Sequence, residues 1–160
     1  MEENGKEIKD FFECLGAIWR DITAIEFLMR GALAQKNGDV NLWPQTPYTK
    51  GKSYNRYPKS FSFKYFEEVA KKFNKEFPKL AIPQELIDFR NAMAHGCIFE
   101  IDNNGVDELI KFRKQKDNTL LIEFSMPLEI KRIQQIRQSL MKLRRFIGQE
   151  ASDKFKNIER

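Results

Sequence analysis

The chain has 160 residues, of which 41% are hydrophobic and 32% are charged, and its formal net charge at pH 7 is +5. This composition predicts one globular domain over residues 1–160 and excludes an intrinsically disordered chain. One histidine and two cysteines are too few ligands for a standard structural zinc site within one chain. We therefore expect no metal or cofactor, and the positive charge favours an anionic partner.

Neither a secretory signal nor a membrane span is recognisable in the sequence. Residues 1–5 provide neither a basic segment nor an apolar one, and no apolar run approaches the roughly 20 residues of a membrane-spanning helix. We expect a cytoplasmic protein that does not enter a membrane.

The first predicted element is a long amphipathic helix over residues 6–35. Its apolar side chains recur at spacings of three, four or seven, which is typical of one buried stripe: Ile8, Phe11, Leu15, Ile18, Ile22, Met29 and Leu33. The polar run 37–39, with glycine at its centre, predicts the end of this helix.

Residues 36–58 predict a long loop that alternates aromatic and basic side chains. Such a mixture suits single-stranded RNA, because rings stack on bases while cations meet phosphates. The candidate RNA-binding residues are Trp43, Tyr48, Lys50, Lys52, Tyr54 and Arg56. The alternative is that these aromatic side chains simply cover the edges of the core.

Two shorter helices are expected next. The first spans residues 60–77, with Ser60 or Ser62 as its N-cap and Pro78 as its stop. The second opens at Pro83, where a missing N–H costs least, and it ends at His95, with Gly96 tolerating a left-handed backbone.

Residues 97–126 predict a β-hairpin insertion. Apolar residues alternate with other residues along two segments, as expected for half-buried strands: Ile110 and Phe112, then Leu120, Ile122, Phe124 and Met126. Residues 116–118 can form the turn, and a short strand over 97–101 is a candidate third member. The alternative is a helix that starts at residues 107–109.

A final long helix is expected over residues 128–147, and the charged tail from Gln149 either extends it or frays. The elements together predict a mainly α protein. Four main helices form a bundle, and the small β-hairpin insertion precedes the last of them.

The most informative short segment is the run from Arg90 to His95, the only histidine of the chain. Asn91 and His95 are four residues apart on the predicted helix and lie on one face, with Arg90 one step around it. An arginine and an imidazole can cleave a phosphodiester without a metal. In the alternative interpretation, His95 stabilises the helix C-terminus and Arg90 pairs with Asp21 or Glu26.

The segment from Leu86 to Gly96 resembles the signature of HEPN domains, an arginine followed after four to six residues by a histidine. Arg90, Asn91 and His95 match this pattern residue by residue. The resemblance implies a HEPN-like helical bundle that forms a homodimer and brings two motifs into one cleft. It also implies a metal-independent endoribonuclease of toxin–antitoxin, abortive-infection or other antiviral defence systems, with RNA as substrate and an antitoxin or other regulatory protein as a further partner. Other HEPN domains are non-catalytic dimerisation, nucleotide-binding or protein-interaction modules.

RNA suits this set of residues because its 2′-hydroxyl supplies the nucleophile. Under the resemblance, His95 acts as general acid and base, Arg90 binds the phosphate, and Asn91 orients His95 or holds the phosphate. The expected products carry 2′,3′-cyclic phosphate ends. Because each chain has one histidine, separate base and acid roles require two protomers.

A third possible function is simple nucleic-acid binding by the 36–58 loop and the basic last helix.

Overall fold

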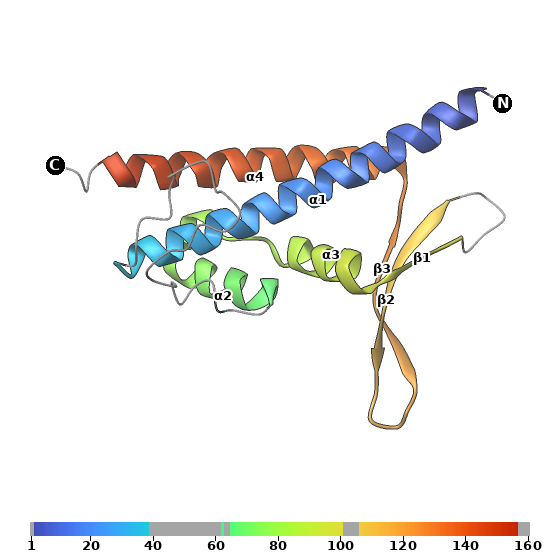
Figure 1. Cartoon of the computed structure of the whole chain (residues 1–160). Helices are drawn as coiled ribbons and strands as arrows, with labels where there is room; N and C mark the ends of the chain where they lie inside the picture. The colour runs from blue at the N-terminus through green and yellow to red at the C-terminus, as the bar shows by residue number, and fades with distance from the viewer. Residues whose placement is uncertain (1, 39–61, 63–64, 101–105, 157–160) are drawn as a thin grey trace, which may run out of the picture. The chain divides into compact units, whose positions relative to one another are not determined.

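The computed structural model describes residues 2–38, 62, 65–100 and 106–156, and over these residues the protein is mainly helical with one small antiparallel sheet (Figure 1). The elements in chain order are α1 (Glu2–Lys36), α2 (Phe66–Glu76), the short 3₁₀ helix η2 (Pro78–Leu80), α3 (Gln84–His95), β1 (Cys97–Glu100), β2 (Asp107–Lys114), β3 (Leu120–Pro127) and α4 (Ile130–Lys156). The predicted mainly α architecture with a β insertion before the last helix is confirmed. Within this described part, no helix combines the length and apolar character needed to cross a bilayer.

The two long helices form as their apolar periodicity predicts. The predicted stripe of α1 is buried from Leu15 onward, and α4 likewise buries side chains at helical spacing, which include Ile133, Leu140 and Ile147. α1 ends where Gly38 takes a positive φ of 68° and its N–H donates to the carbonyl of Gln35 at 2.9 Å. α4 continues to Lys156, so the charged tail extends the helix.

α2 begins later than the sequence predicts. It starts at Phe66, its N-cap is Tyr65 without a side-chain capping bond, and Ser62 lies in a turn outside the helix. Ser60 lies outside the described residues. A serine cap contributes only about 1 kcal/mol, whereas α2 buries Phe66 and Phe73 completely, so packing outweighs the local signal. Pro78 follows the helix as predicted and opens η2.

The sheet has the order β1-β2-β3, with both pairs antiparallel. Cys97 pairs with Ile110, so the candidate third strand is confirmed, and the alternative of a helix at residues 107–109 is wrong because these residues lie in β2. The register shifts between Lys111 and Phe112, which leaves Glu123 as an extra residue in β3. This arrangement is a β-bulge.

The prediction that both strands of the hairpin are half-buried along their length is wrong. Leu109, Ile110 and Met126 are buried, but Phe112 is 41% exposed and Ile122 is 55% exposed. The reason lies in the register, since β1 pairs with β2 only from Asp107 to Ile110. Beyond that point β2 and β3 continue as a two-stranded ribbon, and the pair alone cannot cover its own apolar side chains.

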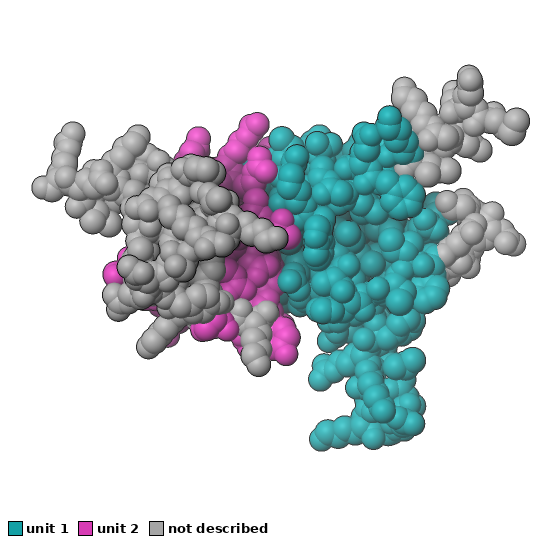
Figure 2. Space-filling model, viewed as in Figure 1, with its two compact units in different colours: residues 1–22, 83–141 teal, residues 23–82, 142–160 magenta. Residues whose placement is uncertain are grey.

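The chain divides into two compact units, coloured separately in Figure 2. Unit 1 comprises residues 1–22 and 83–141, and its buried side chains include Ile18, Ile22, Ile87, Phe89, Leu109, Met126, Ile133 and Leu140. Unit 2 comprises residues 23–82 and 142–160, and its buried side chains include Ile25, Met29, Leu33, Phe66, Val69, Phe73, Ile82 and Ile147. All three candidate catalytic residues belong to unit 1.

Candidate functional site

Helix α3 carries Arg90, Asn91 and His95. It begins at Gln84, with Pro83 as its N-cap, one residue later than predicted. Its buried face consists of Ile87, Phe89 and Ala92, a local pattern that leaves the three polar side chains on the rest of the surface. Arg90 and Asn91 are half-buried, and His95 is the exposed last residue of the helix.

The Arg90 and Asn91 side chains lie next to each other. Nη1 of Arg90 donates to Oδ1 of Asn91 at 3.5 Å, which is long for a hydrogen bond between neutral and charged groups. Asn91 is four residues before His95 and lies on the same face of α3, whereas Arg90 is five residues before His95 and about 140° around the helix. The guanidinium reaches the face of His95 only through its contact with the Asn91 amide.

Gly96 joins α3 directly to β1, and it sets the position of His95. The N–H of Gly96 donates to the carbonyl oxygen of Ala92 at 2.6 Å. A Cβ at Gly96 would lie 2.5 Å from that oxygen and 2.6 Å from the carbonyl oxygen of Ile110 in β2. The backbone around His95 is therefore in close contact with the sheet, and only glycine fits there.

The prediction that Gly96 adopts a left-handed conformation is wrong. Its φ is −90° and its ψ is −177°, an extended conformation that leads into β1. The glycine is required because of the close approach of Ile110, which is 14 positions away in the sequence. No local pattern could have revealed that contact.

The surroundings of the site are polar at the helix end and apolar on the sheet. The carbonyl groups at the C-terminus of α3 favour a cation at His95. Asp21 and Glu26 each make an ion pair within α1, Asp21 with Arg20 at 3.5 Å and Glu26 with Arg30 at 2.6 Å, and the pairing of Arg90 with either carboxylate stays a prediction. Among the described residues, no three acidic, histidine or cysteine side chains gather as a metal-ion site.

Two further features near His95 were not predicted. Phe99 and Phe112 are 43% and 41% exposed and form an edge-to-face ring contact with centroids 6.1 Å apart. The alternation in β2 placed Phe112 beside Ile110 correctly, but it did not show that the ring is accessible.

The predicted RNA-binding residues of the 36–58 loop, Trp43, Tyr48, Lys50, Lys52, Tyr54 and Arg56, lie outside the described residues.

Comparisons with protein-family models, with curated proteins and with solved structures found no match to this chain.

Proposed function

We propose that this protein is a metal-independent endoribonuclease of the HEPN type, in which Arg90 and His95 act on the RNA backbone. The observation that carries the proposal is the exposed imidazole of His95 at the end of α3, one turn after the Asn91 amide that the Arg90 guanidinium contacts. A phosphodiester can reach an exposed imidazole, whereas a core histidine would be inaccessible to it. The spacing of Arg90, Asn91 and His95, which resembles the HEPN signature, supports the same assignment.

The reaction that fits these groups is transesterification by the RNA itself. The 2′-hydroxyl loses its proton to a base and its oxygen attacks phosphorus, and the 5′-oxygen leaves and receives a proton from an acid. The products are a 2′,3′-cyclic phosphate and a 5′-hydroxyl. Arg90 supplies a planar, permanently charged donor for the negative charge that develops on the phosphoryl oxygens. His95 supplies an imidazole, a group that can accept a proton as a base or donate one as an acid.

A homodimer would complete this chemistry. The chain holds one histidine, so a base and a separate acid require His95 from each of two protomers. A twofold axis near the end of α3 would bring the two imidazoles to opposite sides of one phosphate. A role in toxin–antitoxin or another defence system, with an antitoxin or regulatory protein as partner, belongs to this proposal.

A non-catalytic HEPN-like module is the alternative. It is favoured by the contact between Arg90 and Asn91 and by the half-buried position of both side chains, which suit a structural or ligand-holding role. In that case His95 stabilises the C-terminus of α3 by about 0.3–1 kcal/mol. The two functions predict different effects of removing the imidazole: the nuclease loses RNA cleavage, whereas the non-catalytic module loses stability.

The test is a cleavage assay in EDTA with wild type, His95→Ala and Arg90→Ala, next to thermal melts of the same proteins. Gln84→Ala is the matched control, since Gln84 is an exposed polar residue at the other end of α3. We expect wild type and Gln84→Ala to cleave single-stranded RNA, and both site variants to lose at least about 100-fold in rate with little change in melting temperature. Persistent cleavage by purified His95→Ala would refute the nuclease mechanism. A wild type without cleavage, together with a destabilised His95→Ala, would favour the non-catalytic module.

A further inference from the structure

The exposed rings of Phe99 and Phe112 form an accessible aromatic surface on the sheet of unit 1. Paired residues of an antiparallel sheet share a face, and every second residue along a strand lies on that face. Cys97 pairs with Ile110, so Phe99 and Phe112 lie on the same face as this pair, one on each strand. Phe99 pairs with Glu108, four residues before Phe112 on β2, so the two rings make their edge-to-face contact at 6.1 Å across the intervening Cys97–Ile110 pair.

This aromatic surface lies next to the proposed catalytic histidine. His95 directly precedes Gly96, whose backbone touches the carbonyl of Ile110. Phe112 is two residues beyond Ile110 on the same strand and the same face. Figure 1 shows α3 running straight into β1 at the place where β2 and β3 extend away from it.

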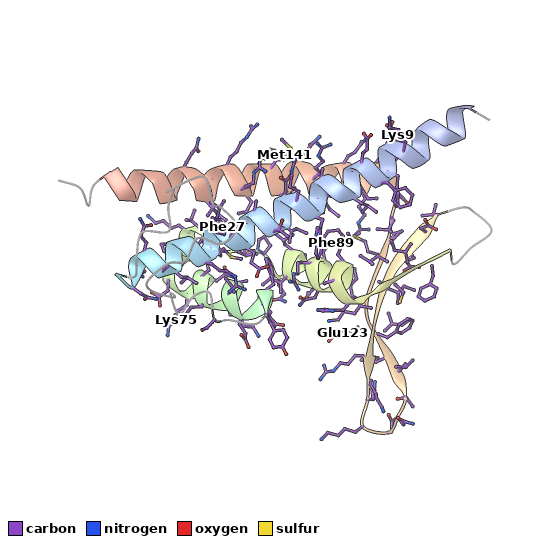
Figure 3. The ribbon with its side chains drawn as sticks, viewed as in Figure 1. Lys9, Phe27, Lys75, Phe89, Glu123 and Met141 are labelled. Atoms are coloured by element: carbon purple, nitrogen blue, oxygen red, sulfur yellow. The ribbon has the colours of Figure 1, made fainter. Side chains whose placement is uncertain are left out.

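The two faces of the ribbon differ in charge and polarity. On the other face, Glu123 accepts from Lys111 at 2.6 Å and lies 3.8 Å from Arg113, so the charges there compensate each other (Figure 3 labels Glu123). The bond from Lys111, with a smaller contribution from Arg113, holds the pKa of Glu123 below its ordinary value. On the face of the two rings, Lys114 lies two residues beyond Phe112 and is exposed, and Glu108, which pairs with Phe99, accepts from the Ser125 hydroxyl.

We propose that Phe99 and Phe112 stack on unpaired RNA bases next to the phosphate at His95, so that the substrate is single-stranded RNA. This inference rests on the proposed function and specifies its substrate class. The rings share their face with exposed Lys114 and with Glu108, which pairs with Phe99, and β1 leads back through Gly96 to His95 at the end of α3. Rings together with nearby cations suit single-stranded nucleic acid, because the bases present flat faces and the phosphates negative charge.

Single-stranded RNA explains the arrangement better than duplex RNA or a protein partner does. In a duplex the bases stack on one another and their faces are not accessible to side chains. Ile122 and Leu120 lie opposite Phe112 and Lys114 and extend the apolar surface, which is also compatible with a protein partner. The position of the rings beside an arginine–histidine pair favours RNA.

The experiment measures binding without cleavage. Wild type, Phe99→Leu and Phe112→Leu are titrated into fluorescent 2′-O-methyl single-stranded RNA, which lacks the nucleophilic hydroxyl, and anisotropy gives the dissociation constants. We expect each leucine variant to bind about 5-fold more weakly or worse, since leucine keeps apolar contact but loses the ring. Phe112→Trp should bind at least as well as wild type. Phe12→Leu is the matched control, because Phe12 is a 63% exposed phenylalanine on α1 of the same unit.

Several outcomes would overturn this inference. One is unchanged affinity in both leucine variants, and another is equal loss with Phe12→Leu. A third is a fall in sedimentation coefficient of the leucine variants at unchanged RNA affinity, which would identify the face as a protein interface. Cleavage assays on the same proteins separate this inference from the nuclease proposal. If binding depends on the rings but natural RNA is not cleaved, the stacking surface is supported and the nuclease proposal is refuted. If RNA is cleaved but binding does not depend on the rings, the nuclease proposal is supported and the stacking surface is refuted.

Discussion

The substitution Gly96→Ala should destabilise the protein through two backbone contacts. The added Cβ would lie 2.5 Å from the carbonyl oxygen of Ala92 and 2.6 Å from that of Ile110. Ordinary carbon–oxygen contacts are about 3.3–3.6 Å, so a methyl group there forces the backbone apart by roughly 0.7–1 Å. Both oxygens belong to backbone, so no side chain can rotate away to relieve the contact.

The expected cost is that of overpacking, about 1–3 kcal/mol. For a chain of this length each kcal/mol lowers the melting temperature by roughly 2–4 °C, so Gly96→Ala should melt roughly 2–12 °C below wild type. Differential scanning calorimetry or circular dichroism gives this difference directly. Because the shift separates the end of α3 from β2, the variant should also cleave RNA more slowly at temperatures where it remains folded.

Gly16→Ala makes the same chemical change with the opposite expected sign. Gly16 lies inside α1, is exposed, and has nothing within 4 Å of the added Cβ. Replacing a helical glycine with alanine at such a site should stabilise the protein by about 0.5–1 kcal/mol. If Gly96→Ala melts at or above the temperature of wild type, the backbone of Gly96 does not approach the carbonyl of Ile110 closely in solution.

Three further predictions concern other contacts. Asn74→Ala should reduce the free energy of unfolding by about 1–3 kcal/mol in urea titrations, since the Asn74 side chain donates to the carbonyl of buried Ile82 at 3.0 Å and accepts from its N–H at 2.7 Å; a loss below about 0.5 kcal/mol would contradict this. Glu123→Gln should lower the melting temperature near neutral pH but not in acid. The pKa of Glu123 is lowered in the folded protein, so its bond from Lys111 stabilises the fold fully above about pH 4.3, the ordinary pKa of a glutamate, and this stabilisation is lost as the pH falls through the pKa of the folded state. A difference in melting temperature between the two proteins that stays constant from pH 7 to 3 would contradict this prediction. Arg90→Lys should retain charge and fold but cleave RNA at least about 10-fold more slowly, because lysine lacks the planar fork, and wild-type rates in this variant would remove the assigned role of Arg90.

Much of the fold follows from local sequence pattern. The stripe in α1 is dense enough that Ile18, Ile22, Met29 and Leu33 were all predicted and are all buried. The start of α2 was missed because Ser62 provides a capping signal that packing of the later phenylalanines outweighs. Local signals therefore identify helices better than they identify where helices begin.

The hairpin shows a different limit. Alternation predicts that Leu120, Ile122, Phe124 and Met126 share one face, and this is wrong because the bulge at Glu123 divides them: Leu120 and Ile122 pair with Lys114 and Phe112, whereas Phe124 and Met126 pair with Lys111 and Leu109 on the other face. Alternation cannot show how far a third strand covers a face, and β1 pairs with β2 only as far as Ile110. Exposure of the distal residues depends on this non-local pairing.

The candidate site depends both on a local helix pattern and on non-local packing against the sheet. The motif from Arg90 to His95 was predicted to close a helix, and it does so. The exposure of His95 and the contact of Gly96 with Ile110 depend on where the sheet packs, which no local pattern describes. The polar residues of the motif are therefore visible in the sequence, but the surface on which a substrate would rest is not.

The central claim is that the RNA's own 2′-hydroxyl is the nucleophile and that Arg90 and His95 assist it. The most direct measurement maps the termini that wild type leaves on a short RNA in EDTA, then repeats the reaction with a single 2′-deoxy nucleotide on the 5′ side of the mapped linkage. We expect 2′,3′-cyclic phosphate and 5′-hydroxyl ends on the first RNA, and no cleavage at that linkage in the second. Cleavage of the deoxy-substituted linkage, or products with a 5′-phosphate, would contradict the account.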